Sequence, residues 1–198
     1  MNATEGTLSP EQRQILLRLA RQGVERAAAG QPGPDVDLGS LPEGLRAERA
    51  AFVTLTLRGD LRGCIGALQA TMPLARDVVE HARAAATEDF RFYPVRPDEA
   101  TELAIEISVL SEPAPLAYAQ PDDLLTLLRP GVDGVILVSG LHRATFLPQV
   151  WEKVPSPALF LDMLCEKAGL PRRAWRTGHP DILIYRVESF HESSAVNP

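Results

Sequence analysis

The stretch AFVTLTLRGDLRGCIGAL, residues Ala51–Leu68, contains two strand-like segments that are separated by a turn. Apolar residues alternate with threonines through Ala51–Leu57, which is the pattern of a half-buried β-strand. Gly59 and Asp60 then reverse the chain, so we expect Leu61–Leu68 to return as the hairpin partner of the first segment. The hairpin predicts a sheet with antiparallel strands at the centre of the fold.

Segments on both sides of the hairpin continue a mixture of helices and strands. Residues 30–44 hold four glycines and three prolines, a composition that breaks regular structure and predicts a loop. Because strands outnumber helices without a regular strand–helix alternation, we expect the α+β class, with a mixed or antiparallel sheet and flanking helices. Periodicity predicts helices that begin at Pro10, Leu74, Pro121 and Pro157, and strands at Leu103–Leu110, Gly134–Ser139, Arg143–Phe146 and Asp181–Val187.

The composition limits the classes of partner and compartment. The chain of 198 residues has a formal net charge of −6 and a pI of about 5.3, so we expect no nucleic-acid partner. No apolar run reaches the ~20 residues that span a bilayer and the N-terminus lacks a secretory signal, so we expect no membrane partner. Two cysteines, Cys64 and Cys165, are too few for a disulfide framework, which predicts a reduced, cytoplasmic protein. No metal-ligand spacing occurs, so neither a metal site nor a cofactor is predicted, and the oligomeric state stays open.

The segment Leu61–Leu68 contains residue types that a strand does not need for its own stability. Period two places Arg62 and Cys64 on one face, and a nearby cation favours the thiolate, which is the nucleophilic form of cysteine. Gly63 and Gly66 remove side chains, which lets a ligand or another backbone approach closely. We therefore expect a functional face with Cys64 as its nucleophile.

The strand predicted at Leu103–Leu110 carries Glu106 and Ser108 on its polar face. If this strand shares a sheet with Leu61–Leu68, we expect the two polar faces to line one concavity together with the loop that contains Arg91. Glutamate and histidine commonly transfer protons in catalysis, so we expect Glu106 or His142 to transfer protons for the Cys64 nucleophile. The candidate catalytic residues are Cys64, Glu106 and His142, and the candidate substrate-binding residues are Arg62, Gly63, Gly66, Arg91 and Ser108.

Structural explanations stay open for the same residues. An unpaired cysteine usually acts as a small packed hydrophobe, so an inert Cys64 is one alternative. Arg62 as a solvated charge with Glu106 as its surface partner is a second. Gly63 and Gly66 as markers of a β-bulge are a third.

The segment LRGCIG, Leu61–Gly66, resembles the hallmark of the AMMECR-type domain family, whose prokaryotic members are called AmmeMemoRadiSam system protein A. The resemblance covers residues 9–192 and departs from the family pattern at Phe90 and Tyr93, which occupy places that are commonly proline. Other similar segments, in the family's order, are FVTL (Phe52–Leu55), RFYPV (Arg91–Val95), ISVL (Ile107–Leu110), DGV (Asp133–Val135), ATFLPQVW (Ala144–Trp151) and FLDMLCEKAGL (Phe160–Leu170).

The resemblance implies a single AMMECR-type domain over residues 1–198, with a matching core of residues 9–192. It implies an α+β fold of two unequal lobes with a cleft between them, and it places the hallmark near that cleft. It also implies association with a Memo-like protein and a radical SAM protein, the other members of the named system. It implies no known reaction.

We therefore expect a cytoplasmic component of the AmmeMemoRadiSam system that binds or modifies an unidentified substrate at the Arg62–Cys64 face. As an enzyme it would be a cysteine-dependent enzyme whose reaction the sequence does not specify. The alternative is a non-catalytic protein-interaction module that docks the Memo-like or radical SAM partner through the same surface.

Overall fold

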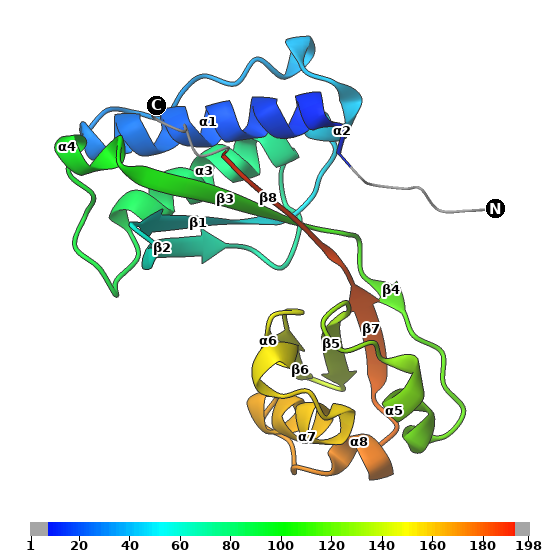
Figure 1. Cartoon of the computed structure of the whole chain (residues 1–198). Helices are drawn as coiled ribbons and strands as arrows, with labels where there is room; N and C mark the ends of the chain where they lie inside the picture. Colours follow the sequence, from blue (N-terminus) through cyan, green and yellow to red (C-terminus); the bar gives the residue numbers. More distant parts are fainter. Residues whose placement is uncertain (1–7, 193–198) are drawn as a thin grey trace. The chain divides into compact units, whose positions relative to one another are not determined.

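The computed structural model describes residues 8–192, and the chain divides into two compact units (Figure 1). Unit 1 consists of the residues up to Leu110 together with those from Glu188 onward, and unit 2 consists of Ser111–Val187. Each unit contains a four-stranded sheet and helices, so the α+β class expected from the sequence is confirmed. No helix among the described residues has the length and hydropathy needed to cross a bilayer.

The sheet of unit 1 begins with the hairpin that the sequence predicts. Thr54 lies opposite Cys64 in the antiparallel pair formed by the first two strands. The strand order is β2-β1-β3-β8, so β2 lies at one edge of the sheet. The strands are β1 (Ala51–Leu57), β2 (Asp60–Gly66), β3 (Leu103–Leu110) and β8 (Val187–His191).

The hairpin departs from regular alternation at Arg62. Leu55 lies opposite Gly63, and the next residue, Thr56, lies opposite Leu61, so Arg62 is an extra residue on β2. This two-against-one pairing is a β-bulge, and it shifts the phase of the side chains that precede it. Strict alternation, from which the sequence analysis placed Arg62 and Cys64 on one face, therefore does not hold through Arg62.

Two long helices, α1 (Pro10–Ala28) and α3 (Leu74–Thr87), cover one face of this sheet (Figure 1). Helix α1 begins at Pro10 as predicted, and Ser9 caps it, because the Ser9 Oγ accepts a hydrogen bond from the Gln12 N–H at 3.2 Å. In return the Gln12 side chain accepts the Ser9 N–H at 2.8 Å. The fully buried side chains between the helices and the sheet include Leu16, Leu55, Leu74, Ile105 and Ile107.

Shorter elements complete unit 1. The glycine- and proline-rich residues 30–44 contain the 3-10 helix η1 (Leu38–Ser40) and run into α2 (Glu43–Arg46). Residues 88–96, which we call the edge loop, lead from α3 to α4 (Pro97–Ala100). The edge loop hydrogen-bonds to β2, and this contact positions the candidate site.

Unit 2 has a sheet and a core of its own. Trp151 stacks on Phe160 with ring centroids 3.7 Å apart, and Cys165 is fully buried in the same core. The strand order is β4-β7-β5-β6, formed by β4 (Ala114–Pro115), β5 (Gly134–Ser139), β6 (His142–Phe146) and β7 (Asp181–Tyr185). The helices are η2 (Pro121–Asp123), α5 (Leu124–Leu127), α6 (Val150–Lys153), α7 (Pro157–Lys167) and α8 (Ala174–Thr177).

Candidate functional site

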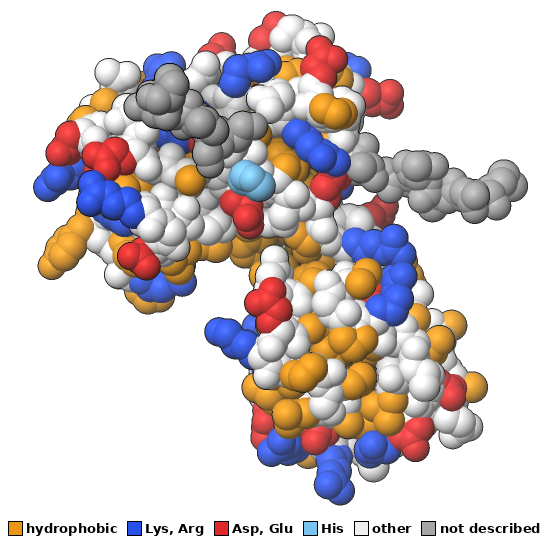
Figure 2. Space-filling view, viewed as in Figure 1, with side chains coloured by type: hydrophobic (Ala, Val, Ile, Leu, Met, Phe, Trp, Pro, Cys, Tyr) orange, Lys and Arg blue, Asp and Glu red, His pale blue; other side chains and the backbone are white. Residues whose placement is uncertain are grey.

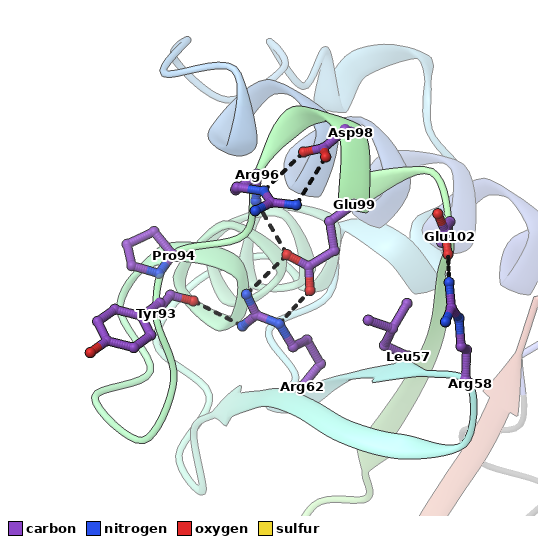
Figure 3. A pocket seen from close by; sticks show the side chains of 9 residues that line it. All are labelled: Leu57, Arg58, Arg62, Tyr93, Pro94, Arg96, Asp98, Glu99 and Glu102. Atoms are coloured by element: carbon purple, nitrogen blue, oxygen red, sulfur yellow. Dashed lines mark hydrogen bonds and ion pairs between the residues drawn. The ribbon is translucent and has the colours of Figure 1, made fainter.

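Arg62, the bulge residue of β2, is bound by a carboxylate from α4. Its Nε donates to Glu99 Oε1 at 2.5 Å, its Nη2 donates to Oε2 at 3.1 Å, and its Nη1 donates to the Tyr93 carbonyl at 2.9 Å (Figure 3). The hydrogen bond from Arg62 lowers the pKa of Glu99, which keeps this carboxylate ionised. Because both side chains are mostly buried, the pair fastens the edge loop and α4 to β2.

Asp89 forms a second clamp between the edge loop and β2. Its carboxylate accepts the Cys64 N–H at 2.9 Å and the Arg91 N–H at 3.2 Å, and it also binds the Arg91 guanidinium at 2.6 and 2.9 Å. Arg91 Nη2 then donates to the Cys64 carbonyl at 3.2 Å. The hydrogen bond from Arg91 holds the pKa of Asp89 well below its ordinary value, although burial opposes the shift. Both backbone polar groups of Cys64 are therefore satisfied at an edge that would otherwise be open to another strand.

The Cys64 thiol lies half-buried beside a hydroxyl and an arginine. Thr54, its partner across the hairpin, donates its Oγ1–H to Cys64 Sγ at 3.4 Å. Asp89 is the main cause that raises the pKa of Arg91, and Cys64 contributes to the same shift through charge and side-chain hydrogen bonding. Arg91, which hydrogen-bonds to the Cys64 carbonyl, is therefore the guanidinium that interacts with Cys64, whereas Arg62, the cation expected from the sequence, is engaged by Glu99.

Glu106 lies in the same row of the sheet as the thiol. Thr54 of β1 is opposite Cys64 on one side and opposite Glu106 of β3 on the other. Because adjacent strands are about 4.8 Å apart, the backbones at Cys64 and Glu106 are about 10 Å apart. Glu106 is exposed, but Ser108 is buried and its Oγ is hydrogen-bonded to Ser189 Oγ at 2.8 Å, so its hydroxyl is not open to a substrate.

The two hallmark glycines are explained by close packing inside unit 1. A Cβ atom on Gly63 would lie 2.2 Å from the carbonyl oxygen of Ala85 in α3. A Cβ atom on Gly66 would lie 2.3 Å from the ring of Phe52 and 2.6 Å from the Ala51 carbonyl oxygen. Of the two alternatives expected for these glycines, a ligand or another backbone, the structure shows a helix backbone against Gly63, and an aromatic ring fills the space at Gly66.

His142 belongs to unit 2, whereas Cys64 and Glu106 belong to unit 1. Its Nδ1 makes a 2.9 Å hydrogen bond with the Ala168 carbonyl inside its own unit. The structure therefore gives His142 a partner other than the proposed nucleophile. Among residues 8–192, no three His, Cys, Asp or Glu side chains are grouped as metal ligands would be.

A cavity of about 410 Å³ opens beside Arg62 in unit 1. Its lining does not include Cys64, Glu106, Ser108 or Arg91, so this cavity is not the shared concavity that the sequence predicts for these residues and Arg62. Its charges are paired with one another: Arg62 with Glu99, Arg58 with Glu102 at 3.0 Å and Arg96 with Asp98 at 2.9 Å (Figure 3). The lining residues are Leu57, Arg58, Arg62, Tyr93, Pro94, Arg96, Asp98, Glu99 and Glu102.

Thr54, Asp89 and Glu99 are site residues that the sequence analysis did not identify. A signal existed for Asp89, because an aspartate two residues before Arg91 has the spacing at which a turn carboxylate binds a backbone N–H. No comparable signal existed for Glu99, since it is 37 residues from Arg62 in the chain. Thr54 could be placed only after the hairpin register was known.

Comparisons with known proteins agree on one family and one fold. A family model described as AMMECR1 matches residues 17–190. A protein from Methanothermobacter thermautotrophicus is 37% identical over 193 residues, which cover 93% of this chain and 96% of the relative. A protein from Thermofilum pendens is 36% identical over 208 residues, with 96% and 93% covered. The crystal structure of an uncharacterised protein from Pyrococcus horikoshii aligns with a TM-score of 0.76 and 31% identity over 92% of each chain.

Proposed function

Because this chain belongs to the AMMECR1 family, we propose that it acts as a component of the AmmeMemoRadiSam system and binds or modifies a substrate at the face that carries Cys64. The LRGCIG hallmark supports membership of the system through its resemblance to the prokaryotic proteins of that name. The partners in this proposal are the Memo-like protein and the radical SAM protein of the same system.

The observation that carries the proposal is the environment of Cys64. A half-buried thiol lies beside the Thr54 hydroxyl and interacts with the Arg91 guanidinium, which Asp89 holds in place. A nearby cation favours thiolate over thiol, and thiolate is the form that attacks an electrophile. In this arrangement Cys64 is the nucleophile, Arg91 stabilises its charge, and Glu106 is the carboxylate available to exchange a proton with a substrate lying along the row.

Iodoacetamide labelling of each cysteine against pH tests this function. We expect Cys64 to react faster than Cys165 in the folded protein, because Cys165 is fully buried and burial raises the pKa of its thiol. Replacing Arg91 with methionine should move the Cys64 labelling profile to higher pH, since the neighbouring charge is removed. Replacing Arg58, which is exposed and paired with Glu102, is the matched control and should leave the profile unchanged.

The dependence of the Cys64 labelling rate on pH distinguishes a loss of the Arg91 charge from a change in the exposure of the thiol. A variant that only uncovers Cys64 would raise its rate at every pH without moving the midpoint. If Cys64 reacts only after the protein is denatured, or if the midpoint is the same with and without Arg91, the thiol is not an activated nucleophile.

A second candidate function is non-catalytic docking of the Memo-like or radical SAM partner. It is favoured by the way two arginines are used: Arg62 of the hallmark and Arg91 of the edge loop hold that loop against β2, and a rigid binding surface requires such bracing. The two functions separate with Cys64→Ser, which would abolish thiol chemistry but leave docking intact. Activity of the reconstituted system with this variant is the measurement.

A further inference from the structure

The register of β3 against β8 follows from two contacts. The Glu192 N–H donates to the Ile105 carbonyl at 3.1 Å, and the Ser108 and Ser189 hydroxyl oxygens are 2.8 Å apart. Both contacts fit a single antiparallel register, because the step along β3 from Ile105 to Ser108 matches an equal step back along β8 from Glu192 to Ser189. The two strands therefore pair without a bulge between these contacts.

This register places His191 opposite Glu106. Because Ile105 and Glu192 form a hydrogen-bonded pair, the neighbouring pair is of the non-hydrogen-bonded kind, in which the two Cα atoms are only about 4.5 Å apart. Glu192 accepts a hydrogen bond from Arg21 of α1 at 3.0 Å, so its side chain lies on the face that the helices cover. His191 and Glu106 therefore lie on the opposite face, and both side chains are exposed.

The pair extends the row of side chains that begins at the thiol. Cys64, Thr54, Glu106 and His191 follow one another across β2, β1, β3 and β8. With strands about 4.8 Å apart, the backbones at Cys64 and His191 are about 14 Å apart. A molecule that reacts at the thiol and lies along this row reaches the carboxylate first and then the imidazole.

The far end of the row offers hydrogen-bond acceptors. Within residues 8–192, no donor or cation is paired with the Glu106 carboxylate or the His191 ring. A carboxylate only accepts hydrogen bonds, and the neutral imidazole ring adds one acceptor nitrogen. A primary ammonium group has three N–H donors and a positive charge, so it matches both acceptors at once.

The attraction for a cation is local to this end of the row. On the face of unit 1 shown in Figure 2, acidic and basic side chains are interspersed, so the surface as a whole does not draw cations to one place. The cations nearest the thiol are already bound, Arg62 by Glu99 and Arg91 by Asp89. An anionic group at Glu106 would be repelled, and an uncharged group would gain no charge pair there.

We propose that Glu106 and His191 form a subsite for a primary ammonium group, so that the substrate of the Cys64 face carries an alkylamine about 10 Å from its electrophilic carbon. This assignment rests on the proposed function in taking Cys64 as the reacting group. It adds the class of substrate, and it assigns His191 to this face in place of His142, which belongs to unit 2. The amine is that of a free small molecule or of a lysine side chain, and the experiment separates these sources.

Alkylation of Cys64 by chloroacetamides of one length tests the subsite. The thiolate displaces chloride and a thioether forms, so peptide mass gives the rate. The pentyl amide measures the reactivity of the thiol itself, and the aminopentyl amide carries an ammonium group about 10 Å away. We expect the aminopentyl reagent to react about threefold to fivefold faster, the effect of one exposed charge pair. Its trimethylammonium analogue, which has the charge but no N–H donor, should react more slowly than the aminopentyl reagent.

Two variants remove the acceptors one at a time. Glu106→Gln should bring the ratio of the aminopentyl rate to the pentyl rate close to one, and His191→Phe, which keeps a ring but no acceptor, should lower it. Glu11→Gln is the matched control, because Glu11 is an exposed carboxylate on α1, which covers the other face of the sheet. All three side chains are exposed, so circular dichroism melting should give the same midpoint for each variant.

Three results would overturn the subsite. The first is an equal rate of the two reagents with the natural chain. The second is a ratio that Glu11→Gln lowers as much as Glu106→Gln does, since the attraction would then come from the net charge. The third is a ratio that His191→Phe leaves unchanged, together with equal rates for the aminopentyl and trimethylammonium reagents, because the imidazole would then accept no hydrogen bond.

A binding measurement keeps the test independent of the thiol. Aminopentyl acetamide, which has no chlorine, and Nα-acetyl-lysine amide are each titrated into the full chain and followed by amide NMR. Shifts at Thr54, Glu106 and His191 that Glu106→Gln abolishes would support the subsite, and the compound that binds more tightly identifies the source of the amine. If these shifts occur while Cys64 resists alkylation, only the proposed function fails. If neither compound shifts these residues, the subsite is overturned.

Discussion

Arg62 of the hallmark strand and Arg91 of the edge loop bind different carboxylates and therefore have different roles. Arg62 is directed by the bulge toward Glu99 and the Tyr93 carbonyl, so its charge is used to fasten a loop. Arg91 shares Asp89 with the Cys64 backbone and also interacts with the Cys64 side chain. Asp89 is therefore the residue on which the position of the thiol depends most directly.

Replacing Asp89 with asparagine should lower the free energy of unfolding by about 1.5–3 kcal/mol, the range for hydrogen bonds to a charged group. An amide keeps one acceptor oxygen, but its NH₂ faces donors that previously met a carboxylate. Urea unfolding measures the change. Asp98→Asn is the control, because its pair with Arg96 is exposed to solvent and should contribute little to the free energy of unfolding. Equal effects of the two substitutions would contradict a special role for Asp89.

The contribution of Asp89 should also depend on pH. Arg91 holds its folded-state pKa well below the ordinary value of 3.8, so the stabilisation is present above that value and is lost as the pH falls through the folded-state pKa. The difference in unfolding free energy between the natural chain and Asp89→Asn should stay constant between about pH 7 and about pH 5, and shrink below about pH 4. A difference that persists unchanged to the lowest pH at which the protein stays folded would contradict this origin.

At the scale of elements, the contact between β2 and α3 explains why the hallmark strand is rich in glycine. Gly63 faces the backbone of α3, and Gly66 faces the ring of Phe52. The edge loop then covers the outer side of the strand through Asp89 and Arg91. β2 is thus enclosed by a helix on one face and a loop along its edge, and this enclosure gives the Cys64 backbone one position.

Gly63→Ala should destabilise unit 1 by about 1–3 kcal/mol, the usual cost of overpacking. The new Cβ would lie 2.2 Å from the Ala85 carbonyl oxygen, so α3 and β2 would have to separate. Gly33→Ala is the control, since its Cβ would make an ordinary 3.4 Å contact with the Val79 side chain. Thermal and urea unfolding of both variants measure the difference in stability. A Gly63 variant as stable as the Gly33 variant would contradict the prediction, because it would show that α3 and β2 can move apart at little cost.

At the scale of the whole molecule, unit 2 is inserted between two neighbouring strands of unit 1. β3 and β8 lie side by side in the sheet. Ser108 is hydrogen-bonded to Ser189, and the Glu192 N–H donates to the Ile105 carbonyl at 3.1 Å, so the strands run antiparallel. The end of β3 and the start of β8 are therefore close together, like the two arms of a hairpin.

Removing unit 2 should leave a unit 1 that folds. Joining Leu110 to Glu188 through an Asn-Gly turn replaces residues 111–187 with a two-residue hairpin connection that suits adjacent antiparallel strands. We expect cooperative urea unfolding and a well-dispersed amide NMR spectrum, because unit 1 has its own core. A shortened chain without a cooperative transition would show that unit 1 depends on unit 2 for its stability.

Local sequence patterns determined several structural features of this protein. The cap at Ser9, the hairpin of β1 and β2, and the buried position of Cys165 in α7 were all predictable, because capping, alternation and helical periodicity act over a few residues. The hallmark strand could likewise be proposed as the centre of a candidate site, since its glycines and its thiol are unusual in a strand.

Tertiary structure alone decided the partners inside that site. Arg62 was expected beside Cys64 because side chains alternate along a regular strand, and the bulge at Arg62 interrupts that alternation. Glu99 and Asp89 reach their partners across 37 and 25 residues of chain, and the packing of α3 against Gly63 brings these segments together. Hydrophobic periodicity does not predict such contacts, because they depend on how one element packs against another and not on the secondary-structure preference of either element alone.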